Sequence, residues 1–99
     1  MIIVTGSVTA RPDSFEALRQ ACVDHTARSR TEDGCFSHNV HVDAENPLRL
    51  FFFEEWTDMA ALQAHFRQPG TAEFIAAVRA YAAASTPPAL FEAAAISGN

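Results

Sequence analysis

The sequence of 99 residues predicts a single domain, residues 1–99, because a chain of this length has room for only one hydrophobic core. Seven arginines and twelve acidic residues give a net charge of -5, which argues against a nucleic-acid partner, and 48% apolar residues indicate a folded chain. No apolar run approaches the ~20 residues that span a bilayer and the N-terminus carries no basic leader, so we expect no membrane partner and a cytoplasmic location.

The first part of the chain predicts a strand followed by a helix. Along residues 2–10 the apolar residues share one side of the expected strand: Ile2, Val4, Val8 and Ala10. Asp13 or Ser14 can cap the next helix, in which apolar and aromatic residues recur at helical spacing: Phe15, Leu18, Cys22 and His25. We expect His25 to be structural, and Gly34 suits a left-handed turn after the helix.

The middle of the chain predicts two strands that form a hairpin. Residues 35–43 alternate, and one side of this strand carries Phe36, His38, Val40 and Val42. The sequence AENP at residues 44–47 is typical of a turn, so the strand predicted over residues 49–56 should pair with the first. This second strand is apolar on both faces until Glu54, a pattern typical of a strand that is covered on two sides.

The last part of the chain predicts a broken helix and a final strand. Asp58 can cap a helix whose inner positions are Met59, Leu62, His65 and Phe66. A Pro-Gly pair at residues 69–70 interrupts it, and residues 71–84 predict a further helical segment with Phe74, Val78 and Tyr81. A Pro-Pro pair at residues 87–88 forces an extended exit, and residues 89–96 are long enough for a last strand.

This order of elements predicts an α+β fold of the ferredoxin-like, split βαβ type. Its antiparallel sheet carries the helices on one side only. The strand over residues 49–56 is nevertheless apolar on both faces, so the uncovered face of the sheet needs a partner. We therefore expect a homodimer that is joined sheet to sheet.

Several polar side chains are expected to converge on one partly apolar cavity. Alternation places Glu54 and Trp56 on the same side of their strand as Phe52. His65 lies on the helix stripe that must face the sheet, and His38 lies on a mostly apolar side of its strand. We take His65, Glu54 and His38 as candidate catalytic residues, because a histidine titrates near neutral pH without help.

Structural roles stay open for the same residues. His65 can instead be a core histidine that is hydrogen-bonded to Glu54 and locks the helix to the strand. Trp56 can be a core aromatic that seals the domain, and His38 can be a half-exposed strand histidine. His41 falls on the opposite face of the strand from His38, which argues against a metal site built from those two residues and His65.

Short motifs carry a resemblance to a known family. They are GC at residues 34–35, FEEW at residues 53–56 and AALQAHF at residues 60–66, followed by Pro69 and Phe74. Together they resemble the antibiotic biosynthesis monooxygenase family, and in particular its quinol monooxygenase-like members. The resemblance implies a dimeric α+β barrel with a pocket between the helices and the sheet.

The chemistry expected of this pocket uses the substrate's own electrons. The sequence shows no metal-ligand spacing, no phosphate-binding glycine loop and no nucleophile elbow, so we expect no metal and no cofactor. The resemblance implies a cofactor-independent monooxygenase, which deprotonates a small electron-rich aromatic substrate such as a quinol, an anthrone or a related polyketide. We expect His65 or His38 to be the base and Glu54 to orient it. The expected substrate-binding residues are Phe36, Phe52, Trp56 and Phe74.

Two functions of other classes remain open. One is a non-catalytic dimeric module that binds a small molecule or is associated with stress. The other is an isomerase that shuttles a proton between His65 and Glu54.

Overall fold

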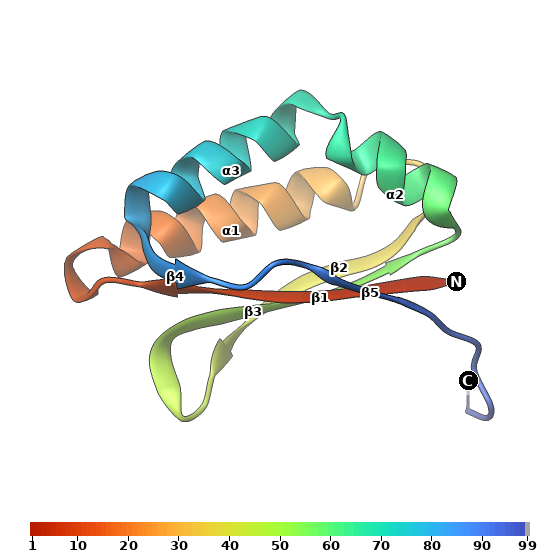
Figure 1. The fold of residues 1–99 in the computed structure, drawn as a ribbon, viewed down its shortest axis with the longest axis horizontal. Helices are drawn as coiled ribbons and strands as arrows, with labels where there is room; N and C mark the ends of the chain where they lie inside the picture. The colour runs from red at the N-terminus through yellow and green to blue at the C-terminus, as the bar shows by residue number, and fades with distance from the viewer. Residues whose placement is uncertain (99) are drawn as a thin grey trace.

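The structure, a computed structural model, describes residues 1–98 of the chain. The elements are, in order, β1 (Ile2–Ala10), the short 3-10 helix η1 (Pro12–Ser14), α1 (Phe15–Ser29), β2 (Cys35–Asp43), β3 (Asn46–Trp56), α2 (Met59–Phe66), α3 (Pro69–Tyr81), β4 (Ala82–Ser85) and β5 (Ala89–Glu92) (Figure 1).

The strands form one antiparallel sheet. Their order is β2-β3-β1-β4, and β5 also pairs with β1. β1 and β3 pair along most of their length, with Val4 opposite Glu54 and Val8 opposite Leu50. β4 and β5 follow one another along the other edge of β1, where Val8 lies opposite Ser85. This arrangement confirms the predicted α+β, ferredoxin-like fold.

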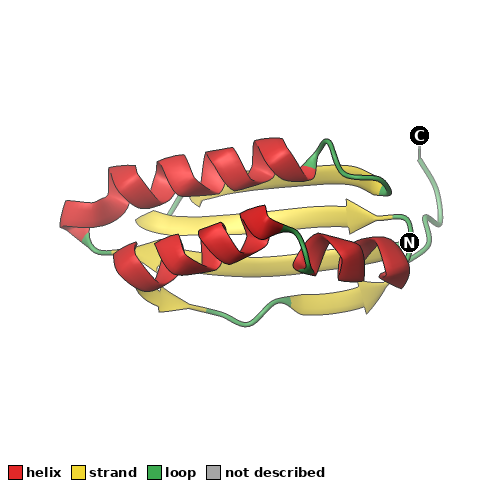
Figure 2. Cartoon of the chain, turned by 90° about the horizontal axis from the view of Figure 1, so that it is seen from above, coloured by secondary structure: helices red, strands yellow, loops and turns green. Residues whose placement is uncertain are grey.

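All of the helices cover one face of the sheet. Figure 1 shows the helix layer above the sheet, and Figure 2 shows α1 side by side with α3 across that face. The larger core cluster joins α1, β1 and β3: Val8, Ala10, Leu18, Cys22, Leu50 and Phe52. A second cluster joins β1, β3 and α2: Ile2, Val4, Trp56 and Leu62. The core therefore lies between the two layers, where the sequence periodicity predicts it.

The structure corrects the predicted boundaries of the C-terminal elements. α3 begins at Pro69, because the missing N–H of proline costs nothing in the first helical turn. It ends at Tyr81, three residues before the predicted end, because Ala82 has extended dihedrals and pairs with Ala10 of β1. The pairing overrides the helix propensity of the alanines. The predicted last strand, residues 89–96, begins at Ala89 as β5 but ends at Glu92, and the sequence missed β4. Residues 86–88 separate β4 from β5, since prolines lack the N–H that a strand ladder needs.

The helix ends agree with the predicted capping chemistry at one position and differ at another. The side chain of Asp58 accepts a hydrogen bond from Ala61 N over 2.9 Å, which confirms the predicted N-cap of α2. Ser14 occupies the N-cap of α1 without a side-chain cap bond; its Oγ donates instead to the carbonyl of Tyr81 over 2.6 Å. Gly34 has φ +83°, and a Cβ there would lie 2.5 Å from Ala61 Cβ, so glycine is required.

A β-bulge in β2 moves Phe36 out of its predicted place. Cys35 pairs with Trp56 and Ser37 pairs with Glu55, so Phe36 is an extra residue without a partner on β3. The bulge reverses the alternation, and Phe36 is 63% exposed, whereas His38 on the inner face is completely buried. The prediction that Phe36 and His38 share one side of the strand is therefore wrong.

The face of the sheet without helices carries several apolar side chains. Ile3, Phe51 and Phe53 alternate with inward-facing residues along β1 and β3, and Phe91 lies opposite Ile3. Phe91 is 53% exposed. This confirms that β3 is apolar on both faces. Within residues 1–98, none of the helices is long and apolar enough to cross a membrane.

Candidate functional site

A cavity of about 490 Å³ lies between the helix layer and the sheet. Its apolar wall includes Val4, Val8, Phe52, Phe74, Ile75 and Val78. Its polar wall includes His25, Glu54, His65, Thr71, Arg79 and Thr86. The volume falls in the range of roughly 300–1,000 Å³ that is typical of small-molecule sites.

Three buried imidazoles gather at this cavity. His25 comes from α1, His38 from β2 and His65 from α2, and their ring centroids lie 5.2 to 5.5 Å apart. One ring nitrogen from each histidine lies within 4.8 Å of the other two. His25 and His65 line the cavity, whereas His38 is completely buried and does not line it.

Glu54 is the carboxylate of the cavity wall. Trp56 Nε1 donates to Oε1 of Glu54 over 2.9 Å, and His38 Nε2 lies 3.3 Å from the same oxygen without hydrogen-bond alignment. Burial raises the pKa of Glu54, but His38, Trp56 and His65 together outweigh burial and hold the pKa below its ordinary value. Glu54 is therefore ionised at neutral pH.

His65 is oriented by a carboxylate that sequence reasoning missed. Its Nδ1 lies 2.8 Å from Oε1 of Glu32, which belongs to the loop between α1 and β2. An ionised carboxylate only accepts hydrogen bonds, so Nδ1 donates and Nε2 is left as the basic nitrogen of the ring. Thr71 Oγ1 also donates to the carbonyl of His65 over 2.7 Å, which fixes the end of α2.

His25 lies on the apolar stripe of α1, as predicted, and it also forms part of the cavity wall. Its ring stacks on Phe74 at 4.3 Å with an interplanar angle of 9°. Burial is the main cause that lowers the pKa of His25 to about 3, and the neighbouring His38 and His65 lower it further. His25 is therefore neutral at neutral pH.

The two thiols are excluded as nucleophiles. Cys22 and Cys35 are free. Burial raises the pKa of Cys22 to about 12, and burial together with Glu54 and Glu32 raises the pKa of Cys35 to about 11. Because the thiolate is the reactive form, neither residue suits nucleophilic catalysis at neutral pH.

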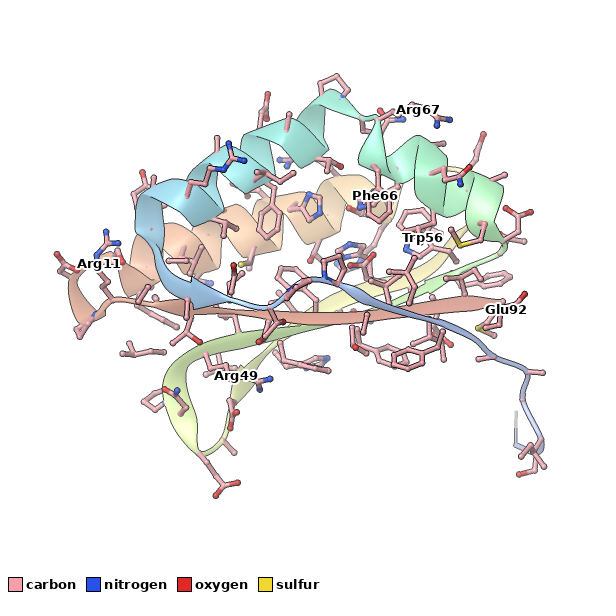
Figure 3. The ribbon with its side chains drawn as sticks, in the orientation of Figure 1. Arg11, Arg49, Trp56, Phe66, Arg67 and Glu92 are labelled. Atoms are coloured by element: carbon pink, nitrogen blue, oxygen red, sulfur yellow. The ribbon has the colours of Figure 1, made fainter. Side chains whose placement is uncertain are left out.

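The structure separates the predicted site residues into three groups. Phe52, Phe74, Glu54 and His65 line the cavity, as predicted. His38 and Trp56 are completely buried next to Glu54, and neither lines the cavity. Figure 3 shows Trp56 between α2 and the sheet. Phe36 lies outside because of the bulge. Phe36, His38 and Trp56 therefore lie outside the wall of the cavity on which the sequence placed them, while the catalytic and substrate-binding roles of all these residues stay predictions.

The imidazole cluster also offers a donor set for a metal ion. Imidazole nitrogens are ligands that suit divalent transition metals. Zinc-nitrogen bonds are about 2.0–2.1 Å long, so ring nitrogens up to 4.8 Å apart would have to move closer together to share one ion. The sequence argued against a metal site of His38, His41 and His65, because His38 and His41 lie on opposite faces of one strand. The fold instead brings His38 and His65 together with His25 of α1.

Similarity to known proteins decides the family of the chain. The family model for antibiotic biosynthesis monooxygenase matches residues 1–77. The chain belongs to the antibiotic biosynthesis monooxygenase family. Solved structures agree with this assignment and confirm the resemblance seen in the sequence motifs. A candidate antibiotic biosynthesis monooxygenase from Deinococcus radiodurans has a TM-score of 0.93 and 26% identity, over 100% of this chain and 98% of that chain.

Two further relatives extend the comparison. Rv0793 from Mycobacterium tuberculosis has a TM-score of 0.81 and 27% identity, over 98% of this chain and 96% of that chain. An uncharacterized Synechocystis protein is 36% identical over an alignment of 77 residues that covers 75% of this chain and 50% of that protein. The chain thus spans about half the length of this curated relative. Residues 1–77, which match the model of the antibiotic biosynthesis monooxygenase family, contain every histidine and carboxylate of the site.

Proposed function

We propose that this family member is a cofactor-independent monooxygenase for an electron-rich aromatic molecule, such as a quinol, an anthrone or a related polyketide. The observation that carries the proposal is an imidazole backed by a carboxylate, His65 with Glu32, in the wall of an apolar cavity. Membership of the antibiotic biosynthesis monooxygenase family supports the reaction class.

His65 is the proposed general base. Glu32 holds Nδ1 as the donor, so Nε2 is free to take a proton from a substrate hydroxyl or an acidic C–H group. Glu54 provides a negative charge at the same cavity, which stabilises the imidazolium that forms. His38 is placed to position Glu54 rather than to meet the substrate, because it lies 3.3 Å from that carboxylate and outside the cavity wall.

The proposed reaction balances with dioxygen as the oxidant. His65 removes one proton, and the substrate anion transfers one electron to dioxygen. The carbon radical and superoxide then form a C–O bond, and the peroxide takes up a proton. Loss of water breaks the O–O bond and gives the ketone or quinone, so one oxygen atom enters the product and the other leaves as water. Apolar walls around the substrate exclude competing water and hold the reactants together.

Oxygen uptake tests this function directly. Protein treated with a chelator is incubated with anthrone or a dihydroxynaphthalene, and we expect one dioxygen consumed per substrate above the buffer rate. With ¹⁸O₂, mass spectrometry should find one labelled oxygen atom in the product. The dimethoxynaphthalene of the same skeleton is the matched control, because it has no acidic proton and should give no uptake. Absence of uptake with every hydroxylated substrate would favour a binding module, and product rearrangement without oxygen uptake would favour an isomerase.

The dimer also belongs to the proposal. The apolar side chains on the helix-free face of the sheet favour a second copy of the chain as their cover. We expect light scattering to give the mass of a dimer for the wild-type protein. Phe53→Asp, in the middle of that face, should give the mass of a monomer with an unchanged circular dichroism spectrum. Val23→Asp, at an exposed position of α1, is the control and should stay dimeric; a monomeric wild type contradicts the proposal.

A further inference from the structure

One arginine of the cavity wall makes no hydrogen bond or ion pair with any other residue of the described range 1–98. The chain has seven arginines, and five of them make hydrogen bonds or ion pairs with other residues: Arg11, Arg19, Arg28, Arg30 and Arg49. In the described part of the chain, residues 1–98, Arg67 and Arg79 make neither. Arg79 lines the cavity and Arg67 does not.

Arg79 lies at the end of the cavity opposite the imidazoles. The cavity wall of α3 begins at Thr71, which bonds to the carbonyl of His65, and reaches Arg79 eight residues later. At 1.5 Å per residue this is a distance of about 12 Å along the helix axis. The neighbouring wall of β1 gives a similar length, since Val4 pairs with Glu54 and Val8 pairs with Ser85. Four strand residues span about 13 Å.

The cavity therefore has opposite charges at its two ends. Glu54 is ionised at one end, and Arg79, an exposed residue of α3, lines the other, with mostly apolar residues between them. An arginine without a carboxylate partner, in a chain with twelve acidic residues, is free to bind an anionic group of a ligand. The hydroxyl of Thr86 lines the same end of the cavity and adds a further possible hydrogen-bond donor.

We propose that Arg79 is a specificity-determining residue that binds an anionic group, such as a carboxylate, of an elongated aromatic substrate. This anion-binding residue would fix the far end of the molecule, so that its reactive ring position meets His65. The inference rests on the proposed function, because it names the substrate class of the same cavity. A single-ring acid is too short to reach both ends, whereas three fused rings that carry an acidic group match the length of the cavity.

The position of Arg79 also has a structural explanation, which the test must separate. Arg79 lies in the last turn of α3, where a cation stabilises the helix dipole. That role affects stability but not the preference of the cavity for charged over neutral ligands. The readout is therefore the ratio of two dissociation constants, measured on the full chain.

Fluorescence titration with anthracene-2-carboxylate and its neutral carboxamide tests the inference. We expect the wild type to bind the carboxylate about 10-fold more tightly than the amide. Arg79→Gln should abolish this preference. Arg67→Gln is the matched control and should retain it, since Figure 3 shows Arg67 on the side of the helix layer that faces away from the sheet.

Three outcomes would overturn the inference: no preference in the wild type, a preference retained in Arg79→Gln, or one lost in Arg67→Gln. Because the titration reads binding and not turnover, its result is independent of the oxygenase proposal. Carboxylate preference without oxygen uptake on any substrate would sink only the proposed function. Oxygen uptake without a charge preference would sink only the role of Arg79.

Discussion

Acidification below about pH 6.5 is expected to destabilise the folded chain because of His25. Burial is the main cause that lowers the pKa of His25 in the folded state from its ordinary value of 6.5 to about 3. His38, His65 and Arg28 lower this pKa further, and Glu54 raises it. Between these values the unfolded chain binds one more proton than the folded chain, so the free energy of unfolding falls as the pH falls. The loss is up to about 1.4 kcal/mol per pH unit, or roughly 5 kcal/mol over the whole interval.

Urea unfolding of a non-titrating variant checks this effect. His25→Gln should lose clearly less stability than the wild type between about pH 6.5 and about pH 5, with circular dichroism as the signal and one protein concentration throughout. Glu54 adds little in this window, because its lowered pKa makes its contribution disappear only at lower pH. His41→Gln, at an exposed position of β2, is the control and should keep the wild-type slope. Equal slopes for the wild type and His25→Gln would contradict the assignment.

The fold could be predicted from local patterns because the packing agrees with them. The alternation of β1 and the cap at Asp58 both appear in the structure as the sequence predicts. The errors arise where tertiary contacts override the local pattern. Ala82–Ser85 has the composition of a helix end, yet it pairs with β1. The bulge at Phe36 is invisible to alternation, since one extra residue reverses every following side chain.

The site could be predicted only in part, for a related reason. Glu54 and His65 could be predicted from the sequence, because each lies on an apolar stripe whose direction the periodicity fixes. Glu32 belongs to a loop, and no periodicity shows where a loop side chain points. Arg79 sits in the last turn of α3 among exposed residues, and only the cavity itself shows that this residue lines it. The helices and strands could therefore be predicted from the sequence, whereas the side-chain contacts between different elements could be found only in the three-dimensional structure.

Replacing His65 is expected to reduce turnover more than any other single change in the cavity. His65→Gln keeps a polar side chain opposite Glu32 but removes the basic nitrogen, so kcat for the oxygen reaction should fall about 10²- to 10⁴-fold. Glu32→Gln should have a smaller effect and should shift the pH profile of kcat/KM, because the carboxylate that stabilises the imidazolium is lost. Oxygen uptake at saturating substrate, measured across a range of pH, checks both variants.

The comparison of the two variants separates a base from a structural lock. If His65 only ties α2 to Glu32, both substitutions should lower the urea midpoint, and any loss of activity should follow the loss of folded protein. If His65 is the base, His65→Gln should stay folded and inactive, while Glu32→Gln stays folded and active with an altered pH profile. His41→Gln should match the wild type in both measurements, because it leaves the cavity unchanged. A folded His65→Gln variant with full activity would exclude His65 as the base, and the proton would then have to go to Glu54, the ionised carboxylate of the same wall.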